Sequence, residues 1–426
     1  MATKPKPKKQ PDRNRGSVPE VVDVLVAGGG HVGLSTALAI ARAAPQLTVA
    51  VADPQPLSAV GNDRRASAVA VAAVRMLRRL DVWEAIEDQA QPIRKMIITD
   101  SRAQDAVRPA FLTFGAAARD GATEGEPFAF MVANSALVGR LRENAAEAGI
   151  RFIEDTVTSF AEEAHALRAA LGSGEAVATR LLIAADGVRS RLREIAGIRT
   201  LEWRYGQSAI VVTVAHERDH EGVAEEHFLP AGPFAILPLV RRRSSLVWTE
   251  RSEDAARLVA ADPFLFQAEL ERRFGHHLGQ LTVEDKPRAF PLGLTLARDF
   301  VRPRFALVGD AAHGIHPIAG QGLNLGFKDA AALAETVVEA HRLGLDIGSL
   351  ATLERYQMWR RFDTVQMGVV TDVLNRLFSN DNPFVRMARD FGLGLVDRMP
   401  VLKARFIQQA SGTGPSLPRL LTGEAI

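Results

Sequence analysis

The sequence predicts an α/β protein that combines a Rossmann-like βαβ domain, an interleaved and mainly antiparallel sheet, and C-terminal helices. The βαβ unit is predicted by a glycine-rich turn that follows an apolar strand and opens a helix. Two later junctions, at residues 181–190 and 305–324, repeat the change from an apolar strand to a polar loop. Between them, residues 205–288 contain the short strand-like runs that are typical of an antiparallel sheet.

Length and composition exclude several classes of protein. The chain has 426 residues, of which 47% are hydrophobic and 24% charged, so it is long enough for two or three domains and a large core. It contains no cysteine, which excludes disulfides, thiolate metal sites, iron–sulfur clusters and cysteine nucleophiles. No apolar run approaches the roughly 18 residues that span a bilayer. A cytoplasmic location fits the lack of cysteine.

The net charge of +2 is unevenly spread along the chain. Residues 1–15 hold six basic side chains and one acidic side chain, so the rest of the chain is slightly acidic. This distribution argues against a nucleic-acid-binding face. We expect residues 1–19 to form a disordered, solvated tail, with a weak attraction to anionic lipid as the alternative.

The first junction has the full dinucleotide-binding pattern. An apolar strand over residues 21–27 leads into Gly28-x-Gly30-x-x-Gly33, and a second strand ends at Asp53, 20 positions after the last glycine. We expect Gly28 to make the tight turn, Gly30 to admit a pyrophosphate and Gly33 to let helix and strand pack closely. The Asp53 carboxylate is suited to accept hydrogen bonds from ribose hydroxyls.

The third junction carries the most chemistry. Residues 309–330 read GDAAHGIHPIAGQGLNLGFKDA, and a helix-forming run follows from residue 326 to about residue 341. Glycines let the backbone approach a ligand closely, and the first-turn N–H groups of a helix have no partner inside the helix. We therefore expect this loop to bind a ligand that carries negative charge.

A helix is also predicted over residues 66–80. An arginine at its N-terminus opposes the helix dipole, which suggests a nearby anion, although an ordinary exposed arginine is an equal alternative. Residues 292–299 are expected to return to the first domain, and residues 352–378 and 384–409 to be helical.

At these junctions the chain resembles the class A flavoprotein aromatic hydroxylases, which share the p-hydroxybenzoate-hydroxylase fold. Within that group it is most similar to the ubiquinone-biosynthesis hydroxylases of the UbiH and UbiF type. The resemblance covers residues 21–423. It is carried by residues 309–330, by ADGVRSRLR at 185–193, by FMVANSALVGRL at 130–141, by YGQSAIVVTV at 205–214, and by the C-terminal SGTGPSLPRLLTGE.

The resemblance implies a division of the chain around an FAD-binding domain. The expected parts are a basic tail at 1–19, a discontinuous FAD-binding domain at 20–95, 128–200 and 289–345, a substrate domain built on a β-sheet at 96–127 and 201–288, and a helical region at 346–426.

FAD is implied to bind across all three junctions. Arg65, with Arg64 as the alternative, matches an arginine near the pyrophosphate, Asn134 a position beside the flavin and Val157 a position near the adenine. Asp186 begins a motif that is thought to serve both FAD and the nicotinamide donor. His31 stands where relatives more often have Met or Pro, and we expect it to offer only its backbone N–H. The remaining implied contacts are Gly28, Gly30, Val32, Gly33, Asp53, Gly309, Asp310, Gly322, Leu323 and Asn324.

The reactive end of the flavin is implied to lie against the third junction. Asp310 is implied to bind the ribityl hydroxyls. Backbone N–H groups at residues 322–324 are suited to stabilise the negative charge of a reduced flavin. Tyr205 is expected to orient a phenol or help to deprotonate it, with a structural role as an equal alternative. The residues implied to line the isoalloxazine ring are Pro317, Gly320, Gln321, Gly322, Leu323 and Asn324.

The resemblance implies an FAD-dependent monooxygenase that uses NAD(P)H and O2, forms a C4a-hydroperoxyflavin and hydroxylates a lipophilic prenylated phenol in ubiquinone biosynthesis. There is no second βαβ motif for the nicotinamide donor, and the sequence does not distinguish NADH from NADPH. Three alternatives use the same fold: hydroxylation of a small soluble aromatic, halogenation or prenyl reduction. A non-catalytic flavin-binding scaffold is a fourth. The four tryptophans are isolated, which argues against the Trp-x-Trp signature of halogenases.

We do not expect a metal site. His313 and His316 lack a third ligand, and His216, His220 and His227 are interpreted as part of a solvated loop.

Residues 384–406 mix basic and apolar side chains. A helix packed on the core is the favoured interpretation, and contact with a membrane or a partner is the alternative. The resemblance therefore implies a cytoplasmic protein, with peripheral contact with the inner membrane or with a ubiquinone-biosynthesis complex left open.

Overall fold

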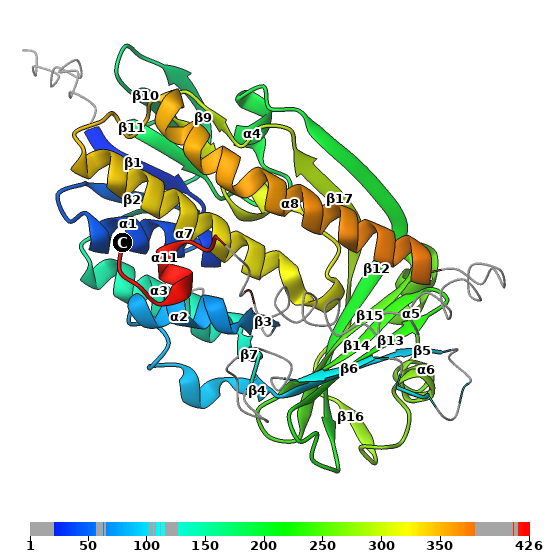
Figure 1. Ribbon diagram of the computed structural model, residues 1–426. Helices are drawn as coiled ribbons and strands as arrows, with labels where there is room; N and C mark the ends of the chain where they lie inside the picture. Colours follow the sequence, from blue (N-terminus) through cyan, green and yellow to red (C-terminus); the bar gives the residue numbers. More distant parts are fainter. Residues whose placement is uncertain are drawn as a thin grey trace, which may run out of the picture.

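A computed structural model describes residues 21–56, 63, 65–101, 105, 108–110, 112–115, 127–379, 412 and 416–426. The predicted basic tail and residues 384–409 lie outside these ranges. Figure 1 shows two large sheets, with the long helix α8 (Leu350–Phe378) running diagonally across the molecule from one to the other. Of the helices that the structure describes, none is long and apolar enough to cross a membrane.

The first sheet has a parallel centre. Strand β1 (Val21–Ala27) pairs in parallel with β2 (Val49–Ala52) on one side and with β11 (Ala176–Ala184) on the other. Strands β8 (Arg151–Ile153) and β19 (Phe305–Leu307) extend the parallel order outward. Apart from the edge strand β8, these strands are mostly apolar and buried, as expected for a parallel sheet covered on both faces. The predicted Rossmann-like domain is confirmed.

Three helices pack around this sheet and its neighbours (Figure 1). They are α1 (His31–Ala43), α3 (Asn134–Glu147) and α7 (Gln321–Arg342). Helix α7 is buried along nearly its whole length, so its alanine-rich sequence allows close packing on several sides. The smaller elements on this side are β9 (Val157–Glu162), β10 (Leu167–Leu171), α4 (Arg191–Ile195), β18 (Val301–Arg302), η2 (Glu87–Gln89) and α11 (Arg419–Thr422).

The second sheet has nine strands and confirms the mainly antiparallel prediction. Only the pairing of β13 with β5 is parallel among its described strand pairs. One face buries Ile210, Phe234 and Trp248 against α5 (Ser252–Ala260) and α6 (Pro263–Phe274). The strands are β5 (Lys95–Asp100), β6 (Leu112–Gly115), β12 (Thr200–His216), β13 (Val223–Leu229), β14 (Gly232–Leu239), β15 (Arg243–Arg251), β16 (Leu281–Val283), β17 (Arg288–Ala297) and β20 (His313–Gly314).

Two predictions about elements are wrong. Residues 292–299 do not return to the first domain, because most of them belong to β17, which pairs with β12 in the second sheet. The helix predicted over residues 66–80 begins only at α2 (Val71–Arg79). Residues 66–70 instead form β3 (Ala66–Ala70), since their backbone pairs with β7 (Ala129–Ala133) in a small sheet that also contains β4 (Gln91–Ile93). Tertiary pairing therefore overrides the local helix propensity.

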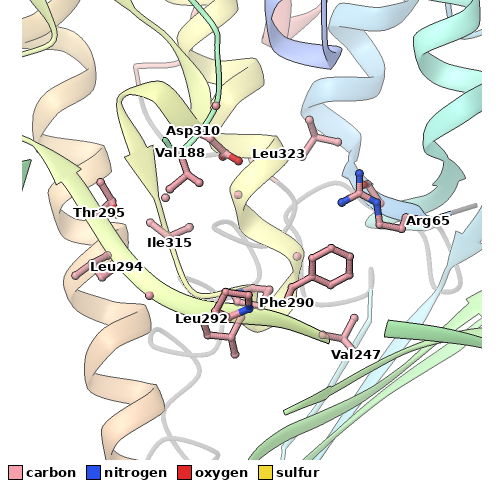
Figure 2. Close-up of a pocket in the computed structure, with 18 of the residues that line it drawn as sticks. Arg65, Val188, Val247, Phe290, Leu292, Leu294, Thr295, Asp310, Ile315 and Leu323 are labelled. Atoms are coloured by element: carbon pink, nitrogen blue, oxygen red, sulfur yellow. The ribbon is translucent and has the colours of Figure 1, made fainter. Parts of the chain in front are cut away.

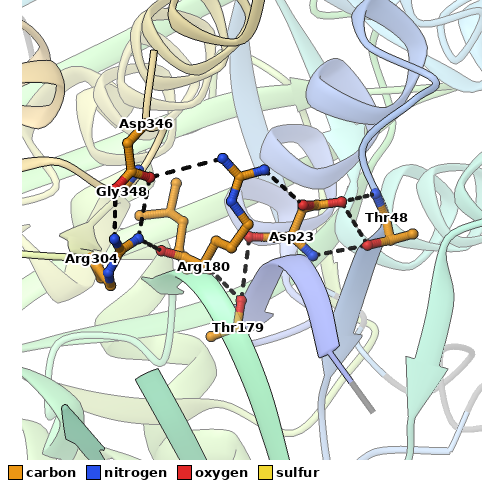
Figure 3. Close-up of polar contacts among 8 residues, drawn as sticks. Asp23, Thr48, Thr179, Arg180, Arg304, Asp346 and Gly348 are labelled. Carbon is orange, nitrogen blue, oxygen red and sulfur yellow. Dashed lines mark hydrogen bonds and ion pairs between the residues drawn. The ribbon is translucent and has the colours of Figure 1, made fainter. Parts of the chain in front are cut away.

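A polar network fixes the end of the parallel sheet that lies away from the glycine turn (Figure 3). Asp23, the one polar residue inside β1, accepts hydrogen bonds from Thr48 N at 2.9 Å and from Arg180 Nη1 at 3.0 Å. Asp346 accepts from Arg304 Nη2 at 2.6 Å and lies 3.9 Å from Arg180 Nη2. Because Asp346 precedes α8, this network joins β1 and β11 to the segment that leads into that helix.

Candidate functional site

A cavity of about 1410 Å³ lies between the two sheets and receives residues from all three junctions. In Figure 2, Asp310 and Leu323 lie toward the top of the view and Leu292, on β17, toward the bottom, while Arg65 lies beside Phe290. We call the part made by Gly30, Gly33, Gly320 and Gly322 with their neighbours the cofactor wall. The sheet wall is made by Ala235, Leu237, Val247, Leu292 and Leu294. Drug-sized ligands occupy cavities of roughly 300–1,000 Å³, so this one has room for a large cofactor together with a substrate.

The glycine turn after β1 shows why each glycine is needed. Gly28 has φ +119°, and a Cβ there would lie 2.3 Å from the carbonyl oxygen of Ala185. A Cβ on Gly33 would lie 2.1 Å from the carbonyl oxygen of Gly28. A Cβ on Gly30 would meet nothing within 4 Å, and Gly30 lines the cavity. Gly28 and Gly33 therefore allow close packing, whereas Gly30 leaves open space for a ligand.

Asp53 lies at the end of β2 and braces this turn. Its Oδ2 accepts a hydrogen bond from Gly29 N at 2.6 Å, and its Oδ1 accepts one from Gln55 N at 2.8 Å. Arg142 Nη2 lies 3.7 Å from Asp53 Oδ1. The carboxylate is held beside the turn, but it does not line the cavity between the sheets.

Several other residues implied to contact FAD also lie outside the cavity lining. Val157 is buried in the core at the start of β9. The Asp186 carboxylate accepts a hydrogen bond from Leu192 N at 3.3 Å, in the first turn of the short helix α4, while its neighbours Ala185 and Gly187 line the cavity. The roles expected for Val157 and Asp186 in binding FAD stay predictions.

Arg65 lines the cavity and is held in place by an acidic partner. Its Nη2 donates to Asp63 Oδ2 at 2.8 Å and its Nε to Asp63 Oδ1 at 2.9 Å, which is a bidentate ion pair. Its guanidinium also lies 5.7 Å from the centre of the Phe290 ring. Burial opposes ionisation of Asp63, but hydrogen bonds from Arg65 and Asn134 outweigh it and lower the pKa of Asp63 to about 2.

Asn134 links this ion pair to β3. Its Nδ2 donates to Asp63 Oδ2 at 3.2 Å, and its Oδ1 accepts from Ser67 Oγ at 2.8 Å. Next to it lies His31, whose buried Nε2 has no hydrogen-bond partner among the described residues. Burial lowers the pKa of His31 to about 4, so the ring is neutral near pH 7. From the sequence, His31 is expected to offer only its backbone N–H to a cofactor. In the structure its side chain also places an unpartnered ring nitrogen beside Asn134.

At the third junction, Asp310 lies in the 3₁₀ turn η4 (Gly309–Ala311) and its carboxylate reaches the cavity (Figure 2). Burial raises the pKa of Asp310 above its usual value, and the nearby Asp329 adds to the increase while His313 opposes it. A carboxyl that is exposed in the lining of a cavity is suited to hydrogen-bond ligand hydroxyls, as expected for ribityl recognition.

Asp329, to which no sequence pattern assigns a role, fixes this loop from behind. Asp329 is fully buried in α7; its Oδ2 accepts from Gly309 N at 3.0 Å and also bonds the His313 ring. Its Oδ1 accepts from Arg360 Nε, on α8, at 2.9 Å. An acidic residue beside the alanine-rich stretch of this helix was the signal available, because a buried carboxylate requires partners. His313 therefore serves this network.

The first turn of α7 lies at the cavity wall. It follows η5 (Ile318–Gly320), whose last residue, Gly320, has φ +62°. The Asn324 side chain faces away from the cavity: its Oδ1 accepts from Ala70 N at 2.8 Å and its Nδ2 donates to Ala68 O at 2.9 Å. Pro317, Gly320, Gly322 and Leu323 line the cavity, whereas Gln321 and Asn324 do not. Asn324 thus holds the first turn of α7 against β3 and does not itself line the cavity.

Tyr205 does not line the cavity. Its ring meets the His316 ring edge to face, with 5.4 Å between the centroids, and burial together with the Asp372 carboxylate on α8 raises its pKa. His316 is fully buried, and neither of its ring nitrogens has a hydrogen-bond partner among the described residues. Burial lowers the pKa of His316 to about 4. The geometry favours the structural alternative for Tyr205.

The interpretation of His216, His220 and His227 as a solvated loop is wrong. All three side chains are buried. His216 hydrogen-bonds Ser244 Oγ at 3.1 Å, His220 hydrogen-bonds Leu239 O at 2.7 Å, and His227 hydrogen-bonds Thr99 Oγ1 at 2.8 Å. The histidines serve as polar links within the second sheet. In the described part of the chain there is no group of three or more side chains that is arranged to hold a metal ion.

These observations define the class of protein. A βαβ turn with an open Gly30, an orphaned His31 nitrogen and a carboxylate in the cavity lining fit a flavin dinucleotide such as FAD. The sequence comparison agrees, since a family model described as FAD binding domain matches residues 21–360. The chain belongs to this family.

Curated relatives share nearly the whole chain. It is 45% identical over 419 residues to the ubiquinone hydroxylase UbiL of Rhodospirillum rubrum, covering 96% of this chain and 94% of the relative. It is 34% identical over 396 residues to the 3-demethoxyubiquinol 3-hydroxylase of Escherichia coli, covering 92% and 98%. It is 32% identical over 448 residues to the mouse mitochondrial ubiquinone biosynthesis monooxygenase COQ6, covering 93% and 92%.

Solved structures support the fold. p-Nitrophenol 4-monooxygenase PnpA from Pseudomonas putida superposes with a TM-score of 0.75 at 19% identity, covering 92% of this chain and 99% of that one. PqsL from Pseudomonas aeruginosa, solved with 2-aminobenzoylacetate, gives a TM-score of 0.72 at 20% identity, covering 85% and 97%. At these identities the likeness shows the fold alone.

Proposed function

We propose that the protein is an FAD-dependent monooxygenase that hydroxylates the aromatic ring of a polyprenylphenol intermediate in ubiquinone biosynthesis, with NAD(P)H and O2 as cosubstrates. The observation that carries this proposal is the cavity, in which a wall suited to FAD faces an apolar sheet wall. The names of the relatives, which are ubiquinone hydroxylases and monooxygenases, support the choice of a quinone precursor.

The sheet wall suits a phenol ring that carries a greasy chain. Ala235 and Leu237 come from β14, Val247 from β15, and Leu292 and Leu294 from β17. These five side chains present hydrocarbon to the cavity, so they favour an apolar substrate, while Gln207 and Glu226 of the same sheet add polar groups to the lining.

FAD, when bound, would supply the activation of O2, with one oxygen atom entering the ring and the other leaving as water at the expense of two electrons from NAD(P)H. Asp310 would hold the ribityl hydroxyls. Pro317 would bring the substrate ring close without adding a polar side chain. The first-turn N–H groups of α7 would favour negative charge at the cofactor wall. Gly30 would leave room for the pyrophosphate.

The site of action follows from the substrate. A polyprenylphenol resides in the bilayer, so the proposal places the protein in the cytoplasm as a peripheral protein of the inner membrane. The segment at 384–406, to which the sequence assigns a membrane or partner contact as an alternative, lies outside the described residues.

The test is quinone-lipid profiling after deletion of the gene, with plasmid-borne variants. Deletion should cause accumulation of an under-hydroxylated prenylphenol, and the wild-type gene should restore ubiquinone. Asp310→Ala should fail to restore it and should yield protein without bound FAD, whereas Asp254→Ala, on the surface of α5, should restore it. Normal ubiquinone in the deletion strain would contradict the proposal. Hydroxylation of small soluble phenols alone would favour the alternative with a soluble substrate.

A further inference from the structure

Helix α8 carries a stripe of exposed apolar side chains. Met358, Phe362, Val365, Val369 and Val373 are 72%, 77%, 41%, 52% and 53% exposed. Their spacing of three or four positions places them on one helix face, over a length of about 22 Å. The outer face of a helix on a globular protein is normally polar, so an apolar stripe of this length indicates a contact. We call these five residues the α8 stripe.

Between residues 361 and 376, the charges around the α8 stripe are basic or neutralised. Arg361 lies within the first half of the stripe and Arg376 lies three residues beyond its last member, Val373; both are exposed. The two aspartates of this part of the helix are already paired. Asp363 accepts from Arg360 Nη1 at 2.7 Å, and Asp372 pairs with Arg376 Nε at 2.9 Å. The stripe therefore offers apolar surface and an unpaired Arg361 without an unpaired carboxylate between residues 361 and 376.

The α8 stripe continues toward the cavity. The Arg376 guanidinium lies 4.2 Å from the centre of the Trp203 ring. Trp203 is 50% exposed and also lines the cavity, and Leu201, on the same side of β12, is 56% exposed. On its other face α8 packs against β17, since a Cβ on Gly368 would lie 3.0 Å from Leu296 Cδ1. An exposed apolar surface and the cavity that holds the sheet wall are thus adjacent.

We propose that the α8 stripe, with Trp203 and Leu201, seats the protein on the surface of an anionic bilayer and that prenylated substrate enters the cavity from this side. This inference rests on the proposed function, which supplies a substrate dissolved in the bilayer. An apolar helix face with arginines at its edges and a tryptophan beside it is the combination that binds in the interfacial region of a membrane. The bilayer is the occupant to which these charges and the adjacent cavity point.

The first experiment is co-sedimentation of the full-length holoprotein with vesicles of phosphatidylcholine and phosphatidylglycerol. Phe362→Asp combined with Val369→Asp should lower vesicle partitioning by about tenfold or more, because it removes two apolar anchors and adds negative charge. The matched control combines Phe264→Asp with Leu265→Asp on α6, where the side chains are 79% and 59% exposed. This control should bind vesicles like the wild type.

The second experiment tests the charge at the edge of the stripe. Arg361→Glu should lower binding to vesicles that contain phosphatidylglycerol by about fivefold or more and should leave binding to pure phosphatidylcholine vesicles unchanged. An equal change on both kinds of vesicle would show that Arg361 does not contact anionic headgroups.

The third experiment separates this inference from the proposed function. With FAD retained, the α8 double variant should hydroxylate a short-chain soluble phenol at the wild-type rate and should slow with a long-chain prenylphenol in vesicles. Vesicle binding that is absent in the wild type or unchanged in the variant would overturn the inference. A change from dimer to monomer with unchanged vesicle binding would assign the stripe to a second copy of the chain. Absence of hydroxylation of either phenol by the wild type would instead overturn the proposed function.

Discussion

The cofactor wall of the cavity is made largely of backbone, whereas the sheet wall opposite is made of side chains. Gly30 shapes the first of these by the space that it leaves, whereas Gly28 and Gly33 admit no Cβ because each packs closely against neighbouring backbone. Val247 and Leu237 shape the second by the volume that they fill. A wall made of backbone tolerates few substitutions, while a wall made of side chains adjusts to a different ligand with small changes. We therefore expect binding of the cofactor and selection of the substrate to be under separate control in this fold.

The largest effect is expected from a substitution that adds a Cβ where the cofactor wall has no space for one. Gly33→Ala places a Cβ 2.1 Å from Gly28 O, so the free energy of unfolding should fall by about 3 kcal/mol, and FAD should be lost. Gly30→Ala is the matched control, because its Cβ meets nothing within 4 Å and its φ of −81° suits alanine. This variant should remain as stable as the wild type by urea denaturation, but should retain less FAD by absorbance. Equal stability of the two variants would contradict the packing argument.

A smaller effect, on the pH dependence of stability, is expected from His316, which is buried in the loop between β20 and η5. The pKa of His316 is about 4 in the folded protein and about 6.5 in an unfolded chain. Between these values the unfolded chain binds the proton and the folded protein does not. The contribution to stability is therefore complete above pH 6.5 and is lost as the pH falls toward 4, by about 2 kcal/mol between pH 6.5 and 5.

His316→Phe keeps a ring beside Tyr205 but cannot take up a proton. Urea denaturation between pH 7 and 5 should therefore show a shallower decline in stability for this variant than for the wild type. His31, whose pKa is also about 4, remains in both proteins and gives the same slope in each. Parallel pH profiles of the two proteins would show that His316 is not buried in neutral form.

The smallest effect on stability is expected at the sheet wall. Val247→Phe narrows the cavity and should raise the KM for the prenylphenol by roughly threefold to tenfold, while Val247→Ala widens it and should change the KM less. Both variants should keep FAD and should differ from the wild type by less than about 1 kcal/mol in the free energy of unfolding. Loss of FAD from Val247→Phe would show that the two walls are not independent.

The same contrast explains how much the sequence could predict. The turn from Gly28 to Gly33 and the strand before it were predictable, because a backbone requirement leaves a local pattern of glycines. Residues 66–70 and strand β17 were misassigned, because their structure depends on pairing with β7 and β12, which are distant in sequence. Asp329 was missed for a similar reason, since its partners Gly309 and Arg360 lie 20 and 31 positions away. The glycine turn of the cofactor wall could be predicted from a local sequence pattern. The structure of β3 and β17 and the role of Asp329 could not, because they depend on tertiary contacts.

The hydrogen bonds of Asn324 determine how late in folding the cavity can form. Its amide bonds Ala68 and Ala70, about 250 positions earlier in the chain, and thereby sets the first turn of α7 against β3. The cavity also needs Gly30 from the beginning of the chain and Asp310 from its last third. Contacts this distant in sequence form late in folding, because a long loop must close first. During synthesis the ribosome therefore completes more than 320 residues before the cofactor pocket can form. We expect the growing chain to bind no FAD before that point.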